Sequence, residues 1–255
     1  MARFASYPSL KDRVVFVSGG GSGIGASIVE HFCEQGSKVG FVDVDAKASK
    51  ALVEAIGGKG WPKPMFRECD VRDTKAYQAA IGEVAKQLGA ITVLVNNAAR
   101  DDRHKLEDVT EAFWDERMAV NLRHQFFAIQ AVAPGMRAAG GGSIVNLSSL
   151  SYVAMTPISA VYQAAKAAVI GMTRGLARDL GPDNIRVNSV MPGWIMTERQ
   201  IRLWLTPEAE ARLMELQCLK EKLYPPDIAR MILWLGADDS RLVTAQNFIV
   251  DGGRN

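Results

Sequence analysis

Seven short apolar runs recur along this chain, and a longer segment with helical periodicity separates most of them from the next. Short runs rich in Val, Ile and Leu predict strands that are buried on both faces, as in a parallel sheet covered by crossover helices. The fold class that follows is α/β, a Rossmann-like doubly wound parallel sheet with helices on both faces. The predicted strands are 14–17, 38–42, 64–69, 91–95, 143–147, 185–190 and 247–250.

The periodic segments between the strands predict seven helices. They cover residues 24–35, 46–56, 74–88, 114–136, 160–180, 207–219 and 226–236. Residues 194–206 are expected to form the longest irregular stretch, a mobile flap over the functional site. The chain has no internal repeat, linker or low-complexity tract, so residues 1–255 are expected to form one domain.

Charge and cysteine usage exclude several classes of function. The formal net charge is +2, and basic and acidic residues are interspersed, which gives no reason to expect a nucleic-acid partner. Cys33, Cys69 and Cys218 lie far apart without metal-ligand spacing, so no metal site is predicted, and reduced thiols in a cytoplasmic protein are expected. The N-terminus does not resemble a cleavable signal, and no stretch approaches about eighteen uncharged apolar residues, so neither secretion nor membrane spanning is expected.

A glycine-rich turn follows the first predicted strand. Gly19, Gly23 and Gly25 surround Ser22 and Ile24, and the next helix begins there. A turn of this kind lets the backbone bend sharply and approach a pyrophosphate closely, and the helix N-terminus offers free amides and a positive dipole to the phosphates. The strand–turn–helix context therefore predicts a dinucleotide site.

Asp43 ends the second predicted strand, eighteen residues after Gly25 (43 − 25 = 18). A carboxylate there can accept hydrogen bonds from both hydroxyls of the adenosine ribose, whereas it would repel a 2′-phosphate. The turn carries Ser22 and no Lys or Arg that would pair with such a phosphate. NAD is therefore predicted as the cofactor in preference to NADP.

Tyr162 and Lys166 are spaced one helical turn apart, so the phenol and the ammonium lie on the same face, where the cation can stabilise a phenolate. A free tyrosine has a pKa near 10 and is a poor base at neutral pH, so the lysine and the nicotinamide cation must lower that pKa to roughly 7. The pair is then a general base for a substrate hydroxyl. Such pairs also occur on many amphipathic helices, so the surrounding motifs decide.

Those motifs occur in a definite order: the glycine turn, Asn96-Asn97-Ala98-Ala99, Asn121, Ser149 thirteen residues before Tyr162 (162 − 149 = 13), and Pro192-Gly193. From about Leu10 to Gly253 the chain resembles the short-chain dehydrogenase/reductase family. The resemblance implies that Tyr162 transfers the proton and that Lys166 lowers its pKa and holds the nicotinamide ribose. It also implies that Ser149 holds the reacting oxygen and that Asn121 positions a water that links the lysine to solvent. Ser148 is a rival for Ser149, and Asn121 could instead bond its own backbone.

The same resemblance implies further cofactor contacts. Asp70 and Val71 are expected at the adenine edge, and Asn97 and its neighbours are expected to line the cofactor channel, although Ala99 stands where the family usually has glycine. The residues after the sixth strand are expected to bind the carboxamide side of the nicotinamide. These implied contacts are Asp70, Val71, Asn97, Ala98, Ala99, Tyr162, Lys166, Pro192, Gly193, Ile195 and Thr197.

A polar stretch, Asp101-Asp102-Arg103-His104-Lys105-Leu106, follows the fourth predicted strand. It is similar to a stretch in bacterial aldose 1-dehydrogenases of the D-xylose, L-arabinose, D-galactose and L-fucose types. A sugar presents several hydroxyls, and a buried site for it must offer matching polar groups. The candidate substrate contacts are Asp102, Arg103, His104 and Ser149, with Tyr152, Met155 and Trp194 as an apolar wall for a pyranose face. Asp102, Arg103 and His104 could contribute polar groups directly or by orienting the loop. The alternative is a surface loop whose charges satisfy one another or bridge subunits.

The activity that this subgroup resemblance implies is NAD-dependent oxidation of the anomeric hydroxyl of an aldopyranose to the aldonolactone. L-Fucose is the first sugar to try, followed by D-xylose, L-arabinose and D-galactose. By analogy with the family a homotetramer is expected. Two alternatives remain: another family member that acts on a polyol, a secondary alcohol or a 3-oxoacyl substrate, and an NAD-sensing module without turnover.

Overall fold

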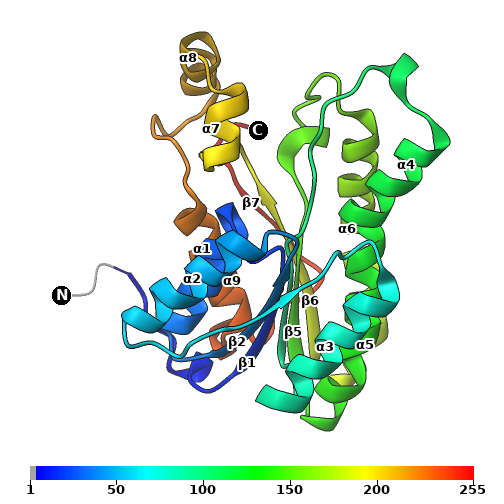
Figure 1. The fold of residues 1–255 in the computed structure, drawn as a ribbon. Coiled ribbons are helices and arrows are strands. Elements are labelled where there is room, and N and C mark those ends of the chain that lie inside the picture. The colour runs from blue at the N-terminus through cyan, green and yellow to red at the C-terminus, as the bar shows by residue number, and fades with distance from the viewer. Residues whose placement is uncertain (1–3) are drawn as a thin grey trace.

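A computed structural model describes residues 4–255 and shows one seven-stranded sheet in the order β3-β2-β1-β4-β5-β6-β7, with every pair parallel (Figure 1). The predicted doubly wound fold is therefore confirmed; residues 1–3 of the predicted domain lie outside the described residues. Chain order reverses between β1 and β4, and ligands bind at such a switch point in open α/β sheets. The strands are β1 (Val14–Ser18), β2 (Lys38–Asp43), β3 (Met65–Glu68), β4 (Val93–Asn96), β5 (Gly142–Leu147), β6 (Ile185–Pro192) and β7 (Asn247–Val250).

Helices cover both faces of the sheet (Figure 1). One face carries α1 (Gly23–Glu34), α2 (Ala46–Gly58) and α9 (Pro225–Gly236), and the other carries α3 (Thr74–Leu88), α5 (His124–Ala138) and α6 (Ala160–Leu180). Three shorter helices complete the chain: α4 (Glu111–Met118), α7 (Glu198–Trp204) and α8 (Pro207–Leu216). Helices α7 and α8 follow β6 and rise beyond the sheet, where they can cover a ligand bound at the strand ends (Figure 1).

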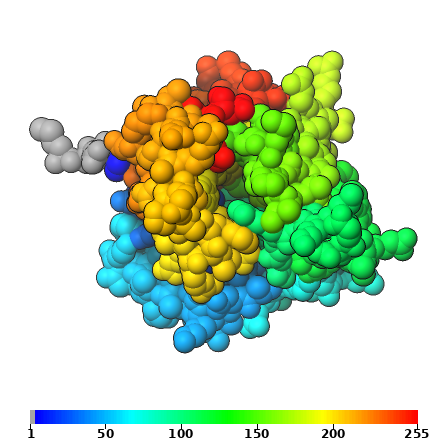
Figure 2. Space-filling model, turned by 90° about the horizontal axis from the view of Figure 1, so that it is seen from above, coloured from blue at the N-terminus to red at the C-terminus, as the bar shows by residue number. Residues whose placement is uncertain are grey.

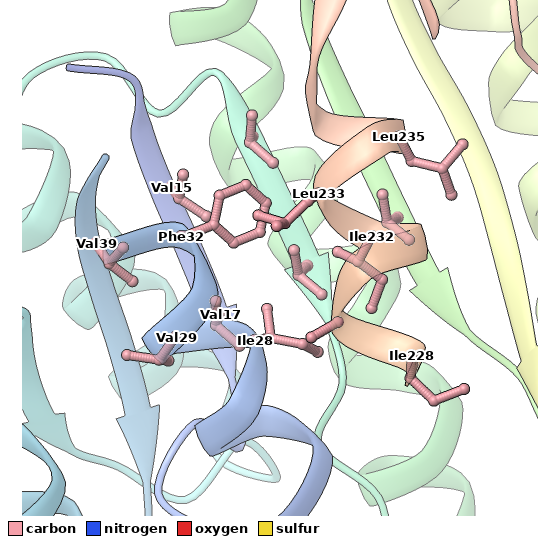
Figure 3. Packing of buried hydrophobic residues seen from close by; sticks show 14 of the residues in the cluster. Val15, Val17, Ile28, Val29, Phe32, Val39, Ile228, Ile232, Leu233 and Leu235 are labelled. Atoms are coloured by element: carbon pink, nitrogen blue, oxygen red, sulfur yellow. The ribbon is translucent and has the colours of Figure 1, made fainter. Parts of the chain in front are cut away.

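The sheet separates two apolar clusters. On one side Phe32 of α1 is fully buried and lies between Val15 of β1 and Leu233 of α9 (Figure 3). On the other side Phe16 and Tyr77 pack at a ring-centroid distance of 6.1 Å. Successive residues of β1 thus enter opposite clusters, which is why its sequence is apolar without alternation. Burial on both faces holds the strand ends rigidly, and these ends carry the functional side chains.

The predicted single helix 114–136 is wrong. Helix α4 begins earlier, at Glu111, because Thr110 caps it by accepting a hydrogen bond from the Phe113 amide. The segment Ala119–Arg123 is then a π-helical turn, and α5 continues to Ala138. π-Turns inside helices are frequent at functional sites, and this one contains Asn121.

The prediction of an irregular 194–206 segment is also wrong, because α7 lies within it. The Thr197 side chain caps this helix by accepting from the Gln200 amide, and Thr206 caps α8 in the same way. Helix α8 ends at Leu216, short of the predicted residue 219, because the amides of Cys218 and Leu219 bond the carbonyls of Gly253 and Gly252. Within residues 4–255 no helix is long and apolar enough to cross a membrane.

Candidate active site

A cavity of about 1290 Å³ opens at the carboxyl ends of β1, β2, β4, β5 and β6. Viewed onto this end, the molecule is hollowed between the segment coloured yellow to orange, which holds α7 and α8, and the green segments (Figure 2). Most of the predicted cofactor and catalytic residues line it: Gly19, Ser22, Gly23, Ile24, Gly25, Asp43, Asp70, Val71, Asn97, Ala98, Ala99, Ser149, Tyr162, Lys166, Pro192, Gly193, Ile195 and Thr197. Among residues 4–255 no cluster of His, Cys, Asp and Glu side chains could hold a metal ion.

The glycine turn is packed so closely that side chains cannot be added. A Cβ at Gly25 would lie 1.8 Å from the Gly19 carbonyl oxygen, and one at Gly19 would lie 2.8 Å from the Cα of Ala98. Gly19 also has a φ of +66°, which side chains rarely adopt. The Asn97 amide donates to the Gly19 carbonyl at 2.8 Å and so ties the turn to the end of β4. No side chain caps the N-terminus of α1, so the backbone there fits a pyrophosphate.

Asp43 lies at the end of β2 beside this turn. One carboxylate oxygen accepts from the Gly21 amide at 2.8 Å and the other accepts from the Asp45 amide at 3.0 Å. A Cβ at Gly21 would lie 2.5 Å from the Ser49 hydroxyl and 2.9 Å from the Asp43 carboxyl carbon. The carboxylate is therefore held in one orientation at the cavity wall, with oxygen lone pairs left for two ribose hydroxyls.

Asp70 is paired with a residue that the sequence did not single out. Arg72 contacts its carboxylate at 2.5 Å and reaches Glu116 of α4 at 2.5 Å. The hydrogen bond from Arg72 holds the pKa of Asp70 below its ordinary value. Asp70 is thus ionised, as an acceptor for the exocyclic amine of an adenine must be.

Tyr162 and Lys166 project from the first turns of α6. The Lys166 ammonium is buried, donates to the Leu147 carbonyl at 2.8 Å and lies 5.7 Å from the centroid of the Tyr162 ring. Ser149, at the end of β5, shares a hydrogen bond with the Tyr162 hydroxyl. The structure therefore brings three of the four predicted catalytic side chains together at one wall of the cavity.

Burial dominates the ionisation of this pair. It raises the pKa of Tyr162 above its ordinary value, against the hydrogen bond from Ser149, and it lowers the pKa of Lys166 to about 7, against the charge of Asp101. Without the nicotinamide cation the pKa of Tyr162 thus stays above its ordinary value. The expectation that this cation and Lys166 together lower it to roughly 7 stays a prediction. A buried phenol favours its neutral form, so further positive charge beside it is needed for the phenolate.

Ser148 and Ser149 have different partners. The buried Ser148 hydroxyl donates to the Lys166 carbonyl at 2.7 Å, so it fixes the backbone of α6. Ser149 lines the cavity, and besides its bond with Tyr162 it accepts from the Ser151 amide at 3.2 Å. The geometry thus leaves Ser149 for contact with a substrate.

Asn121 is fully buried and does not line the cavity. Its amide nitrogen donates to the carbonyls of Arg100 and Arg117, each at 3.0 Å, and its oxygen accepts from the Arg100 amide at 2.9 Å. Both of its N–H donors are therefore used by backbone. One acceptor, the Arg117 carbonyl, belongs to its own helical segment, and the other holds the segment after β4 against the π-turn. The implied role of Asn121 in positioning a water stays a prediction.

The polar segment after β4 is also held internally. Asp102 pairs with Arg117 at 2.5 Å, with Arg100 at 2.8 Å and with Arg199 of α7 at 2.9 Å. Burial disfavours its charge, but the arginines outweigh burial and keep the pKa of Asp102 below its ordinary value. Asp102 is absent from the cavity wall and thus orients the segment.

His104 joins that segment to the catalytic helix. Its Nε2 accepts from the Val161 amide at 3.2 Å in the first turn of α6, and its own amide donates to the Ile158 carbonyl at 2.8 Å. Arg103 lines the cavity with its guanidinium 3.7 Å from the centroid of the Trp204 ring. His104 is thus a positioning residue for the start of α6, and Arg103 is a contact with α7.

The three residues proposed as an apolar wall separate in the structure. Trp194 lines the cavity and is half-buried. Met155 is 82% exposed, and neither it nor Tyr152 is part of the cavity wall. Tyr152 and Met155 lie in the turn over residues 150–155, which directs both side chains away from the cavity.

Comparison with known proteins gives consistent matches. Residues 19–255 match the protein family described as "Enoyl-(Acyl carrier protein) reductase". The chain is 53% identical to the "Probable galactose dehydrogenase" of Rhizobium meliloti (strain 1021), over 98% of this chain and 97% of that protein. It is 47% identical to the D-xylose 1-dehydrogenase of Caulobacter vibrioides (strain NA1000 / CB15N), over 98% of each. A solved 7α-hydroxysteroid dehydrogenase complexed with NADH and 7-oxo glycochenodeoxycholic acid has a TM-score of 0.90 at 30% identity, over 96% of both chains.

Proposed function

Because the chain belongs to the short-chain dehydrogenase/reductase family, a family of NAD(P)-dependent enzymes that act on CH–OH groups, we propose that it oxidises the anomeric hydroxyl of an aldopyranose to the aldonolactone. The observation that carries the proposal is the meeting of Ser149, Tyr162 and Lys166 in one cavity with the glycine turn. The two sugar dehydrogenases at 53% and 47% identity support an aldose as substrate.

Each side chain has a role in the proposed reaction. The Tyr162 oxygen takes the proton of the C1 hydroxyl as the C–H bond at C1 breaks. Ser149, hydrogen-bonded to Tyr162, holds the same substrate oxygen. Lys166, one helical turn away, stabilises the phenolate by its charge. When NAD is bound, it supplies the hydride acceptor.

We propose NAD as the cofactor in preference to NADP. The support is Asp43, whose carboxylate is fixed by the amides of Gly21 and Asp45 where the adenosine ribose is expected. The glycine turn fits a pyrophosphate for the packing reasons given above. A 2′-phosphate in that place would lie close to the Asp43 carboxylate and be repelled. The turn has no Lys or Arg that could pair with it.

The assembly and location are also proposals. We infer that residues 1–255 act as one domain, which is supported by a single sheet with strands from Val14 to Val250. A homotetramer follows from family analogy, and sedimentation velocity would test it against a theoretical monomer mass of 27.7 kDa. The three cysteines form no disulfide, which supports a cytoplasmic protein.

The test of the activity is NADH formation at 340 nm with L-fucose, D-xylose, L-arabinose and D-galactose, beside polyols, secondary alcohols and a 3-hydroxyacyl thioester. A Tyr162→Phe variant, which removes the proton acceptor and keeps the ring, is the control for chemistry. We expect turnover of an aldose that the variant lacks. Activity on another alcohol and on no aldose would leave the family intact and remove the sugar assignment.

A further inference from the structure

A chain of hydrogen bonds connects the cavity wall to the segment after β4. The Trp194 indole nitrogen donates to Oε1 of Gln200 at 2.9 Å, and Nε2 of Gln200 donates to Oδ2 of Asp101 at 2.6 Å. Trp194, Gln200 and Asp101 all line the cavity. Trp194 follows β6, Gln200 belongs to α7 and Asp101 follows β4, so three separate parts of the chain meet in this relay.

The far end of the relay is anchored. Oδ1 of Asp101 accepts from Arg199 at 3.2 Å, and the same Arg199 nitrogen donates to Asp102 at 2.9 Å. Asp102 in turn contacts Arg117, whose side chain is only 8% exposed. Both oxygens of Asp101 are therefore engaged by protein donors, and its carboxylate cannot turn freely toward a ligand.

The relay also decides which surface the tryptophan presents. An indole has one hydrogen-bonding atom, its N–H, and Gln200 accepts from it. The rest of the ring can offer only an apolar, π-electron surface to the cavity. A pyranose has one face rich in C–H groups, which packs on such a surface, while its hydroxyls point toward polar partners.

From these contacts we infer that Asp101, acting through Gln200, fixes the indole of Trp194 as the apolar wall on which the sugar ring packs, and so sets which aldoses bind well. This inference rests on the proposed aldose dehydrogenase function. Asp101 and Gln200 are positioning residues, and Trp194 is the residue that touches the sugar. The same relay ties α7 to the segment after β4.

The first test is steady-state kinetics of Gln200→Leu, which removes both hydrogen bonds at similar size. A lost hydrogen bond corresponds to roughly a two- to tenfold change in an equilibrium constant. We expect KM for the best aldose to rise by about tenfold, since two bonds are lost, with kcat changed less than about threefold and KM for NAD unchanged. Preference between two epimeric aldoses should fall by a similar factor. Gln246→Leu, at an exposed glutamine whose amide donates to the Thr244 carbonyl, is the matched control and should change neither constant.

Two further variants separate positioning from general destabilisation. Asp101→Asn retains an oxygen that can accept from Gln200 and should keep most of the wild-type KM, whereas Asp101→Leu should behave like Gln200→Leu. In a Trp194→Phe background, where the indole N–H is absent, Gln200→Leu should have no further effect on KM for the aldose. An equal effect of Gln200→Leu in both backgrounds would overturn the inference, because Gln200 would then act by another route.

A spectroscopic measurement does not depend on turnover. The chain has five tryptophans, so protein labelled with 5-fluorotryptophan gives five ¹⁹F resonances, and Trp194→Phe identifies that of Trp194. Gln200→Leu should shift this resonance and leave in place those of Trp61, Trp114 and Trp234, which lie outside α7. If no aldose is oxidised, the proposed function fails whatever the resonance does. If an aldose is oxidised, but neither the resonance nor KM responds to Gln200→Leu, the function stands and the inference fails.

Discussion

Replacing Lys166 with Met should stabilise the folded protein near neutral pH while it abolishes activity. The side chain is buried, and the one hydrogen bond that its ammonium makes among residues 4–255 goes to the Leu147 carbonyl. Burial lowers its pKa from 10.5 to about 7. In the unfolded chain the same amine is exposed and charged. Folding at neutral pH must therefore either deprotonate the Lys166 ammonium or remove its hydration shell, and each costs free energy. A Met side chain carries no charge, so its burial has neither cost.

The magnitude follows from the two pKa values. Between pH 7 and 10.5 the unfolded state binds more protons than the folded state, so this lysine makes stability increase as pH rises. Its destabilising contribution is about 4 kcal/mol at pH 7 and about 1 kcal/mol at pH 9.5, and it approaches zero above the unfolded pKa. The variant also removes one donor from the Leu147 carbonyl, which still accepts from Nε2 of Gln125 at 3.5 Å, and the lost hydrogen bond costs about 1 kcal/mol at every pH. The stability gained by Lys166→Met should thus be about 3 kcal/mol larger at pH 7 than at pH 9.5.

The assay is urea unfolding without cofactor, followed by circular dichroism at both pH values and at one protein concentration. Lys50→Met on α2, at an exposed position, is the control for losing a lysine charge and should show no such pH dependence. The reasoning is refuted if the difference between Lys166→Met and wild type is the same at both pH values within about 1 kcal/mol. If Lys166→Met still abolished activity with that result, the catalytic need for Lys166 would be independent of the effect of its burial on stability.

Three further predictions concern the same site and its supports. Burial lowers the pKa of His124 to about 3, so the folded state excludes its proton and stability falls as pH drops below 6.5. Between pH 8 and pH 4.5 wild type should lose about 3 kcal/mol that His124→Leu retains, as urea midpoints at the two pH values would show. Gly25→Ala places a Cβ 1.8 Å from the Gly19 oxygen and should abolish NAD binding in a fluorescence titration, whereas Gly175→Ala, with open space around it, should bind as wild type does. Asp43→Ala should lower the ratio of kcat/KM for NAD over NADP by at least about tenfold, because the repulsion of a 2′-phosphate is lost; an unchanged ratio would place cofactor choice elsewhere.

Much of the fold and part of the site were predictable from local sequence. Strand β7 was predicted with its observed bounds, as were helices α3 and α6, because apolar periodicity and helix boundaries are properties of neighbouring residues. The 114–136 helix was not, because a π-turn depends on the contact of Asn121 with Arg100, twenty-one residues earlier. Helix α7 was missed because its cap, Thr197, lies in a segment that had been assigned to a flap.

The glycine turn and the order of the motifs around Tyr162-x-x-x-Lys166 were enough to indicate the chemistry, because each motif consists of residues close together in the chain. Only the tertiary structure decided how the polar segment after β4 is used. Asp102 looked like a sugar ligand and is held by three arginines from three parts of the chain, while Asp101, beside it, reaches Trp194 through Gln200. Local spacing specifies which side chains share a face of one helix or strand. Which distant charge pairs with a given side chain, as Arg117 and Arg199 do with Asp102, depends on the packing of the whole sheet.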